Sequence, residues 1–389
     1  MSFVISGMKD SLFGAGNSAA FGAAGKAMAE LGVAGCIGAT CVHQDLISMD
    51  MIRALSKTTF SILLPMFLGT GIIKAVATYG LTKSSMGIPI LAVVHSYMMF
   101  LISKHMLLPL LGMNGDAPTV VSCSFGNSGV VPLIFAEALF RQQPDLLAKC
   151  YAHISMYLVG WSPFMWSFGR TMLIGSDDDN DKTSDGTQHQ DNTLTTRLEA
   201  LKRLFSPPVV GVMTGLILAI SPLRPIFLST SADRNAPLGV FYNSFQNLGR
   251  AANPLALLVL TSSLAMGAGG TSQNVDNTER SSGTVNPLSR WACVSIARFL
   301  VSPTLMMIML KAMTRIGMIE SSQTDPMLWF VMLLESCMPP AQNSVLMLQV
   351  ADRGAEANRM AKFLFSIYTT AMLPVIVIVT MALRAFELA

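Results

Sequence analysis

The sequence contains few charged residues. Asp, Glu, Lys and Arg make up 13% of its 389 residues, and the formal net charge is +3. So few charges exclude an ordinary soluble protein of this length, and the small net charge gives no reason to expect nucleic-acid binding. Hydrophobic residues make up 51% of the chain. This composition predicts an all-α, polytopic membrane protein.

Signatures of enzymes and metal sites are also absent from the sequence. There is no nucleophile elbow, no HExxH motif and no Walker loop. The five histidines are not at metal-ligand spacing, and the six cysteines lie almost entirely in apolar runs without forming a CxxC pair. We therefore expect no catalytic activity, no metal and no cofactor, and we expect the cysteines to be buried free thiols.

Long apolar runs are abundant by contrast. A run of about 20 apolar residues is long enough to cross the hydrocarbon core of a bilayer as a helix. The sequence has ten such runs, at residues 19–42, 55–76, 86–111, 119–140, 150–174, 207–223, 251–268, 291–313, 328–350 and 361–383. We predict a transmembrane helix at each of these positions.

A polar stretch at residues 176–206 divides the apolar runs into two sets of five. Its acidic beginning lacks large apolar residues, which is typical of a linker without a fixed structure. We predict a first five-helix repeat at 1–175 and a second at 207–389. Lysine and arginine counts on the two sides are too similar to fix the orientation, but Arg197, Lys202 and Arg203 favour a cytosolic linker.

The two halves of the chain show internal similarity. Phe100–Ser103 in the third run resembles Phe299–Ser302 in the eighth, and Pro65 and Pro254 lie midway in the second and seventh runs. These correspondences together favour a duplication. Because each repeat has an odd number of spans, the second repeat must be inverted in the membrane relative to the first.

The fourth and ninth apolar runs are interrupted by residues that break a helix. The fourth contains Gly126, Gly129 and Pro132, and the ninth contains Pro339 next to Pro340. Proline removes a backbone donor, and carbonyls freed at membrane depth are tolerated only where the protein encloses them. Interrupted spans at corresponding positions of two halves predict the central binding site of a transporter.

Two motifs at these interruptions resemble those of a known family. Residues 125–133 resemble the fourth-span motif of the auxin efflux carrier family, and residues 337–343 resemble its ninth-span motif, most closely in the PIN-LIKES branch. Supporting stretches lie at residues 55–65, 206–211, 221–224 and 252–260. The resemblance therefore covers nearly the whole chain from about residue 18.

This resemblance implies a fold and a mechanism. It implies two inverted five-helix repeats whose broken fourth and ninth helices cross at the substrate site. The first, second, sixth and seventh helices would form a scaffold, and the others a transport unit that moves like an elevator. It further implies auxin (indole-3-acetic acid) as substrate, the endoplasmic reticulum membrane rather than the plasma membrane, and a homodimer through the scaffold. A short central linker and Gln342 depart from the family pattern and leave the substrate open.

The helix breaks also suit an organic anion without the resemblance. Half-helix amino ends that face each other present N–H groups and partial positive charge to a carboxylate. Asn127, Gln342 and Asn343 would add neutral donors, and the deeper Tyr157 an aromatic ring. Alternatively, the two asparagines only satisfy backbone groups freed at the breaks. Gly126 and Gly129 would permit the close crossing.

Glu335, Arg298 and His95 are ionisable residues that lie inside apolar runs. Charge is costly in hydrocarbon, so these side chains are expected to face the protein interior. In one hypothesis Glu335 and Arg298 pair and replace a coupling cation, which makes transport uniport. In a second, Glu335 or His95 exchanges a proton and couples transport to pH. The third reading is a static ion pair or an arginine whose side chain extends to the membrane surface.

The sequence therefore predicts a carrier that moves a small organic carboxylate, auxin-like by resemblance, by alternating access. Two alternatives stay open. One is a cation- or proton-coupled carrier of another organic anion with similar architecture. The other is a membrane sensor that binds its ligand without moving it.

Overall fold

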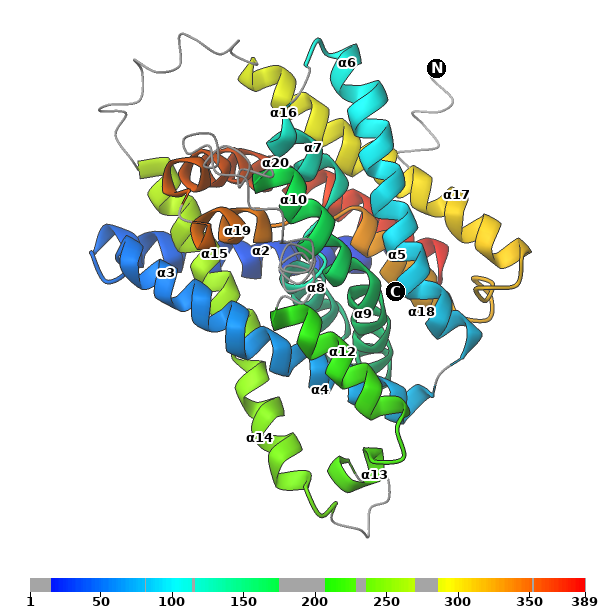
Figure 1. The fold of residues 1–389 in the computed structure, drawn as a ribbon. Coiled ribbons are helices and arrows are strands. Elements are labelled where there is room, and N and C mark those ends of the chain that lie inside the picture. The colour runs from blue at the N-terminus through cyan, green and yellow to red at the C-terminus, as the bar shows by residue number, and fades with distance from the viewer. Residues whose placement is uncertain are drawn as a thin grey trace, which may run out of the picture.

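The computed structural model describes residues 15–80, 82–113, 116–174, 207–228, 236–269, 286–351 and 353–388. Within these ranges every regular element is a helix (Figure 1). The predicted all-α class is therefore confirmed for this part of the chain. The linker predicted at 176–206 lies outside the described residues.

Helices of the first half extend beyond most of the predicted apolar runs. The first run lies within α2 (Ala15–His43). The second lies within a long rod formed by α3 (Met49–Thr58), a π-helical turn and α4 (Leu64–Tyr79). The elements that follow are α5 (Lys83–Ile102), α6 (Leu108–Leu110), α7 (Ala117–Ser124), α8 (Val130–Phe140), α9 (Pro144–Phe164) and α10 (Arg170–Ile174).

The second half contains one substantial helix that the sequence reading missed. This is α14 (Gly239–Arg250), which is amphipathic and leads directly into α15 (Ala252–Gly269). Its polar residues hid it from a search for apolar runs. The other elements are α12 (Pro207–Ile220), α13 (Arg224–Phe227), α16 (Pro287–Ile296), α17 (Ser302–Arg315), α18 (Pro326–Ser336), α19 (Asn343–Val350) and α20 (Gly354–Ala385).

In the described part of the chain, four helical stretches are long and apolar enough to cross a membrane. They are Met49–Thr78, Lys83–Leu110, Pro287–Arg315 and Gly354–Ala385. Several other predicted spans contain shorter apolar helices, namely Val130–Phe140, Pro207–Ile220 and Pro326–Ser336. The first and last of these are halves of the interrupted fourth and ninth runs, so neither could cross the bilayer by itself.

Small residues let α4 and α12 pack closely. A Cβ atom on Gly215 would lie 2.6 Å from Cα of Gly69, and one on Gly211 would collide with the backbone of Pro65. Such close backbone approach strengthens helix association where no hydrophobic driving force acts between helices. The extensive contact between α4 and α12 therefore forms a fixed part of the bundle.

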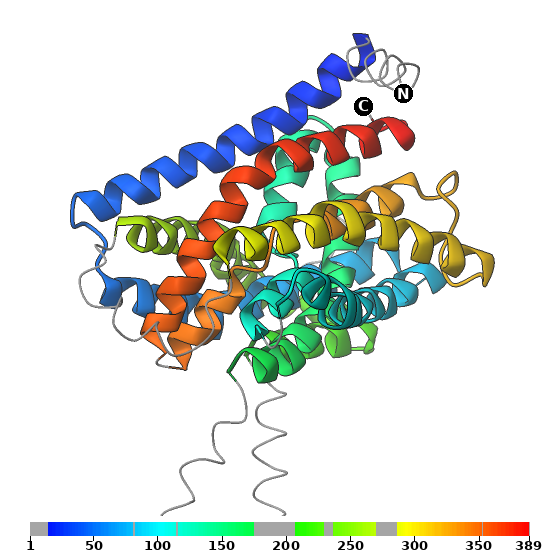
Figure 2. The same cartoon turned by 90° about the horizontal axis from the view of Figure 1, so that it is seen from above.

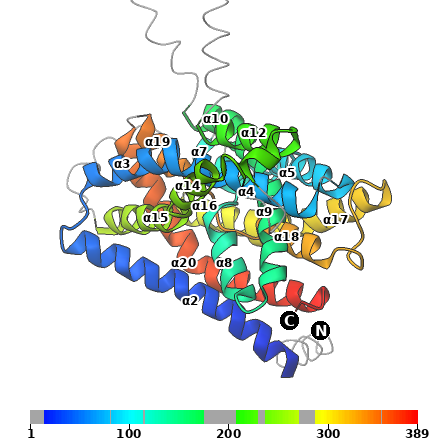
Figure 3. The same ribbon diagram turned by 90° about the horizontal axis from the view of Figure 1, so that it is seen from below.

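Helix α2 runs along one side of the molecule beside α20 (Figures 2 and 3). It also packs on α15 and α8. Elements far apart in sequence are thus neighbours, and α8, the second half of the interrupted fourth run, is packed from outside by α2. The interior between these elements contains the two helix breaks.

Candidate functional site

Both expected helix interruptions are present. The fourth run ends its first helix at Ser124 and resumes at Val130, and the ninth ends at Ser336 and resumes at Asn343. Pro132 lies in the first turn of α8, where a missing N–H costs little because no helical bond uses it. The extended residues between the helix halves are left to find hydrogen-bond partners elsewhere.

The two breaks supply those partners to each other. Gly126 and Pro340 form an antiparallel β-bridge. The N–H of Asn127 donates to the carbonyl of Pro339 at 2.7 Å, and the N–H of Ala341 donates to the carbonyl of Phe125 at 2.9 Å. Backbone groups freed in an apolar region are thereby satisfied by a second broken helix instead of water. We call this joint, residues 125–127 with 339–341, the crossover.

Arg298 lies directly against the crossover. Its side chain is 1% exposed, and Nε donates to the carbonyl of Met338 at 2.9 Å. One Nη donates to the carbonyls of Ser336 and Glu335 at 3.0 and 3.4 Å. These carbonyls end α18, so the guanidinium caps the negative end of that half-helix. A Cβ on Gly126 would collide with this guanidinium, which explains the glycine.

Glu335 is not the side-chain partner of Arg298 that one hypothesis expected. Its carboxylate is 1% exposed, and neither oxygen has a hydrogen-bond partner among the described residues. Arg298 binds the main chain of Glu335 instead, because the helix break itself leaves carbonyls free at that point. The pairing hypothesis is therefore wrong in its geometry, although both residues lie together behind the crossover.

His95 belongs to the same buried group. Its Nε2 lies 3.2 Å from the carbonyl of Ser302 and 3.3 Å from the hydroxyl of that residue. The Ser302 hydroxyl also donates to the carbonyl of Ser336 at 2.7 Å. The structure thus brings His95, Arg298 and Glu335 to one region, and none of the three lines the cavity described next.

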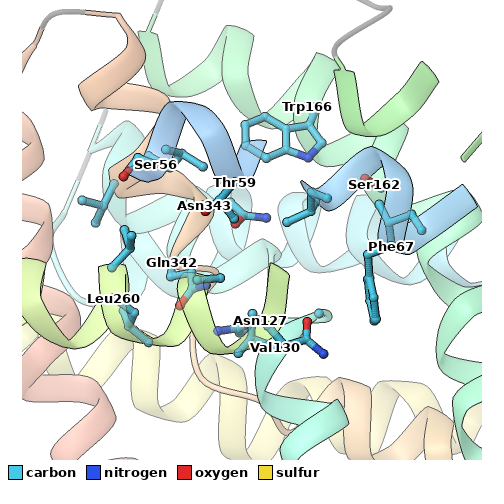
Figure 4. A pocket seen from close by; sticks show the side chains of 18 of the residues that line it. Ser56, Thr59, Phe67, Asn127, Val130, Ser162, Trp166, Leu260, Gln342 and Asn343 are labelled. Carbon is cyan, nitrogen blue, oxygen red and sulfur yellow. The ribbon is translucent and has the colours of Figure 1, made fainter. Parts of the chain in front are cut away.

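A cavity of about 70 Å³ lies beside the crossover (Figure 4). Asn127, Gln342 and Asn343, three of the predicted substrate residues, line it together with Gly129. Tyr157 does not: this side chain is buried inside the helix bundle. The cavity wall is built from α3, α4, α8, α9, α15 and α19, with polar contributions from Ser56, Thr59, Ser162, Asn253, Ser263 and Gln349.

Two helix amino ends face this cavity. Gly129 precedes α8 and Gln342 precedes α19, both line the cavity, and neither helix start receives a side-chain cap. At the start of α19 the N–H groups of Ser344 and Val345 donate to the carbonyls of Ala341 and Gln342, so the N–H of Asn343 is the one that stays available to a ligand among the described contacts. Both helix starts carry the positive end of a helix dipole, and neither has a side-chain oxygen as its cap. None of the described residues that line the cavity is charged. Its electrostatic character thus comes from dipoles that favour an anion.

Asn127 has a structural role in addition to facing the cavity. Its Nδ2 donates to the hydroxyl of Tyr368 at 2.8 Å, and that hydroxyl donates to the carbonyl of Pro340 at 2.9 Å. Tyr368 comes from α20 and was not singled out by the sequence. Asn127 is thus fixed relative to the crossover, which agrees with the view that one asparagine serves both backbone and ligand.

The cavity also contains polar atoms without a partner. Thr59 Oγ1, Ser263 Oγ, Trp166 Nε1 and Gln342 Oε1 are buried without a hydrogen-bond partner in the described part of the chain, and of these four residues the sequence predicted Gln342 alone. Unpaired buried polar atoms are costly and favour a bound ligand or water at such a place. Aromatic side chains of Phe67, Trp161 and Trp166 lie on the same wall.

A charged group fixes the outer end of α18. Asp325 accepts from the N–H of Leu328 at 3.1 Å and lies 3.1 Å from Nε2 of His153 and 3.9 Å from Nζ of Lys149. Burial by itself raises the pKa of the Asp325 carboxyl, but its bonds to His153 and Leu328 outweigh burial and hold that pKa below its usual value. The broken helix is therefore anchored by an ionised cap.

Comparison with known proteins shows the family of this chain. The model of a family described as "Membrane transport protein" matches residues 24–379. Relatives from Arabidopsis thaliana include PIN-LIKES 3, 22% identical over 287 residues, which are 64% of this chain and 68% of that protein. PIN-LIKES 7 is 24% identical over 277 residues, or 60% of this chain and 65% of the relative. The match thus spans about two thirds of each relative's length.

Proposed function

Because this chain belongs to the membrane transport protein family, the auxin efflux carrier family that its motifs resemble, it is an integral membrane transporter, and we propose that it carries a small organic carboxylate by alternating access. The family is one of transporters and not of enzymes. The proposed binding place is the cavity beside the crossover.

The observation that carries this proposal is the pair of uncapped half-helix amino ends at one neutral cavity. Each such end stabilises an anion by about 0.3–1 kcal/mol when exposed and by up to about 2 kcal/mol when partly buried. A carboxylate between α8 and α19 would accept from both ends. Asn127, Gln342 and Asn343 would then fix its orientation.

The rest of the cavity supports an aromatic or amphipathic body on this carboxylate. Phe67, Trp161 and Trp166 offer apolar faces against which a ring can stack. The unpaired Trp166 Nε1 and Thr59 Oγ1 add polar groups that confer specificity. We propose an auxin-like acid on this basis, with indole-3-acetate as the first compound to test.

We further propose that the described helices form two inverted five-helix repeats, residues 1–175 and 207–389. Three pairs of corresponding features support this. Pro65 and Pro254 lie within α4 and α15, π-helical turns occur at Ser103–Leu107 and Ala297–Val301, and breaks follow α7 and α18. The scaffold would contain α2 to α4, α12, α14 and α15, and the crossover would belong to the moving unit.

By the same resemblance, we propose an elevator-type displacement, a homodimer through the scaffold and a place in the endoplasmic reticulum membrane. The cavity supports the displacement, since residues of α3, α4 and α15 line one part of it and those of α8, α9 and α19 line the rest. A ligand there would lie between the two proposed units, as alternating access requires.

Uptake into vesicles tests this function. Purified protein is reconstituted in liposomes, and uptake of radiolabelled indole-3-acetate is compared with protein-free liposomes. A carrier accumulates label, whereas a sensor binds it without accumulation. Asn343→Ala should reduce uptake at equal protein content, because it removes a donor at the start of α19. Unchanged uptake in this variant would remove Asn343 from the site.

A further inference from the structure

Behind the crossover, on a different set of side chains from those of the cavity, lies a buried acid whose carboxylate has no hydrogen-bond partner in the described part of the chain. We propose that Glu335 is a proton-binding site that makes this protein a proton–anion symporter. The inference rests on the proposed carboxylate carrier and adds the coupling ion, which was one of the alternatives left open by the sequence.

The isolation of the carboxylate is the first step. Glu335 is 1% exposed, and neither of its oxygens has a hydrogen-bond partner among the described residues. An ionised carboxylate without donors is among the most costly groups to bury, whereas the protonated acid is neutral and carries much less of this cost. An environment that excludes water and gives the carboxylate no donor therefore favours the protonated form of Glu335.

The surrounding charges set the consequence of this protonation. Arg298 is the fixed cation of the group, and its donors are directed to carbonyls of residues 335, 336 and 338. The other titratable neighbours of Glu335 and Arg298 in the described chain are Tyr157 and Cys150 of α9, Cys337, Cys123 of α7, Tyr368 of α20, and His95 of α5. With these side chains neutral, the group carries a net positive charge when Glu335 is protonated and none when it is ionised.

Ser128, next to the crossover, connects the acid with the cavity. Ser128 lies between Asn127 and Gly129, which both line the cavity, while its own side chain is buried and faces Glu335. The Ser128 hydroxyl donates to the carbonyl of Gly126 at 3.4 Å. A small rotation of this hydroxyl would bring it to the carboxylate, so Ser128 gives a proton a route across the joint.

Charge coupling follows from this arrangement. A net positive group directly behind the crossover strengthens the binding of an anion in front of it, because little water separates the two. Proton binding and anion binding must then strengthen each other by the same factor. Each cycle would move one proton with one monovalent carboxylate, and no net charge would cross the membrane.

Proton uptake on binding tests the coupling directly. Indole-3-acetate is added to purified full-length protein in weakly buffered detergent solution with a pH indicator, at several values between about pH 6 and 9, a range that includes the raised pKa values known for buried glutamates. The ligand itself is ionised there. We expect the wild-type protein to take up about one proton per bound anion at the pH where coupling is strongest.

Two variants complete the test. Glu335→Gln is neutral at every pH and should bind indole-3-acetate without proton uptake, and in vesicles it should convert electroneutral uptake into uptake that carries current. Glu137→Gln is the matched control, because Glu137 lies on α8 with 58% of its side chain exposed. It should behave like the wild type.

The outcomes distinguish a failure of proton coupling from a failure of carboxylate binding. Binding by the wild type with no proton uptake at any pH overturns the role of Glu335, and so does uptake of protons by the Glu335→Gln variant. If the Glu335→Gln variant does not fold, the wild-type measurement alone decides whether anion binding is coupled to proton uptake. Absence of any indole-3-acetate binding overturns the carboxylate site, and the coupling with it.

Discussion

Ser56 and Gln349 share a hydrogen bond of 3.3 Å although 293 positions separate them in the chain. Ser56 lies in α3 and Gln349 near the end of α19, and both line the cavity. In the proposed architecture this bond joins the scaffold to the transport unit. It must break whenever the two units move past each other.

Ser56→Ala should therefore speed the transport cycle. A buried hydrogen bond of this kind contributes about 1 kcal/mol, so its loss should raise the maximal uptake rate up to about fivefold while the KM changes little. Initial rates in proteoliposomes measure both. Ser366→Ala is the control, because this exposed serine bonds only within its own helix at 2.7 Å. A lower or unchanged maximal rate in Ser56→Ala contradicts the role of the bond as a latch.

Gly126→Ala should damage the crossover. The added methyl group would collide with the Arg298 guanidinium, and overpacking of this kind costs about 1–3 kcal/mol. We expect a lower melting temperature in detergent and a loss of uptake. Gly129→Ala is the control for stability. A Cβ at this position meets nothing within 4 Å, so the melting temperature of this variant should stay close to that of the wild type. Equal melting temperatures of the two variants would show that Arg298 does not require the glycine.

Tyr368→Phe should weaken substrate binding. It removes the hydroxyl that accepts from Asn127 and donates to Pro340, and it leaves a buried carbonyl without its partner at a cost of about 1–3 kcal/mol. The expected result is a raised KM, because Asn127 loses the contact that orients it. Tyr97→Phe, at an exposed tyrosine, should leave the KM unchanged. If both variants transport alike, Asn127 is positioned by other contacts.

Acid should destabilise the wild-type protein through Asp325. The pKa of this carboxyl is lower in the folded chain than its ordinary value of 3.8, so its stabilising contribution is complete above that value and is lost as the pH falls through the folded value. Asp325→Asn keeps a capping oxygen but cannot ionise. Its melting temperature should be lower at neutral pH and should fall less below about pH 4.

The control for this pH dependence is Asp50→Asn. Asp50 lies 3.5 Å from Arg53, and its side chain is 92% exposed, so its ion pair should contribute little. The melting curve of this variant should follow the wild type at each pH. A wild-type-like pH profile in Asp325→Asn would instead show that another carboxylate dominates the acid transition.

The interruptions of the helices could be predicted because they depend on local chemistry. Pro339 and Pro340 lack N–H groups and Gly126 favours an extended backbone, so the helix ends follow from the residues themselves. The bridge between Gly126 and Pro340 could not be derived in the same way. It depends on where two distant segments meet, and the resemblance to a family supplied that expectation.

The contacts of Arg298 differ from the ion pair that one of the open hypotheses contained. A lone acid and a lone base in apolar runs suggest an ion pair, since each is costly alone. The helix break, however, creates free carbonyls at residues 335, 336 and 338, and these occupy the guanidinium. Predicting this would have required joining two correct inferences, namely that α18 ends there and that its last carbonyls need donors.

The cavity wall was predicted only where residues belonged to the breaks. Asn127, Gln342 and Asn343 line it as expected. Thr59 and Ser263 were missed, because a single hydroxyl in an apolar helix usually bonds to its own backbone and gives no functional signal. We predicted that Tyr157 binds substrate because it lies deep in the fifth run. Depth, however, does not tell which side of a helix faces the cavity.

The joint between the broken helices is made from main-chain atoms, with bonds from Asn127 to Pro339 and from Ala341 to Phe125. Replacing a neighbouring side chain does not remove these bonds. The crossover can therefore keep its shape while the residues that line the cavity change. New substrate preferences can therefore arise here by single substitutions, without rebuilding the crossover.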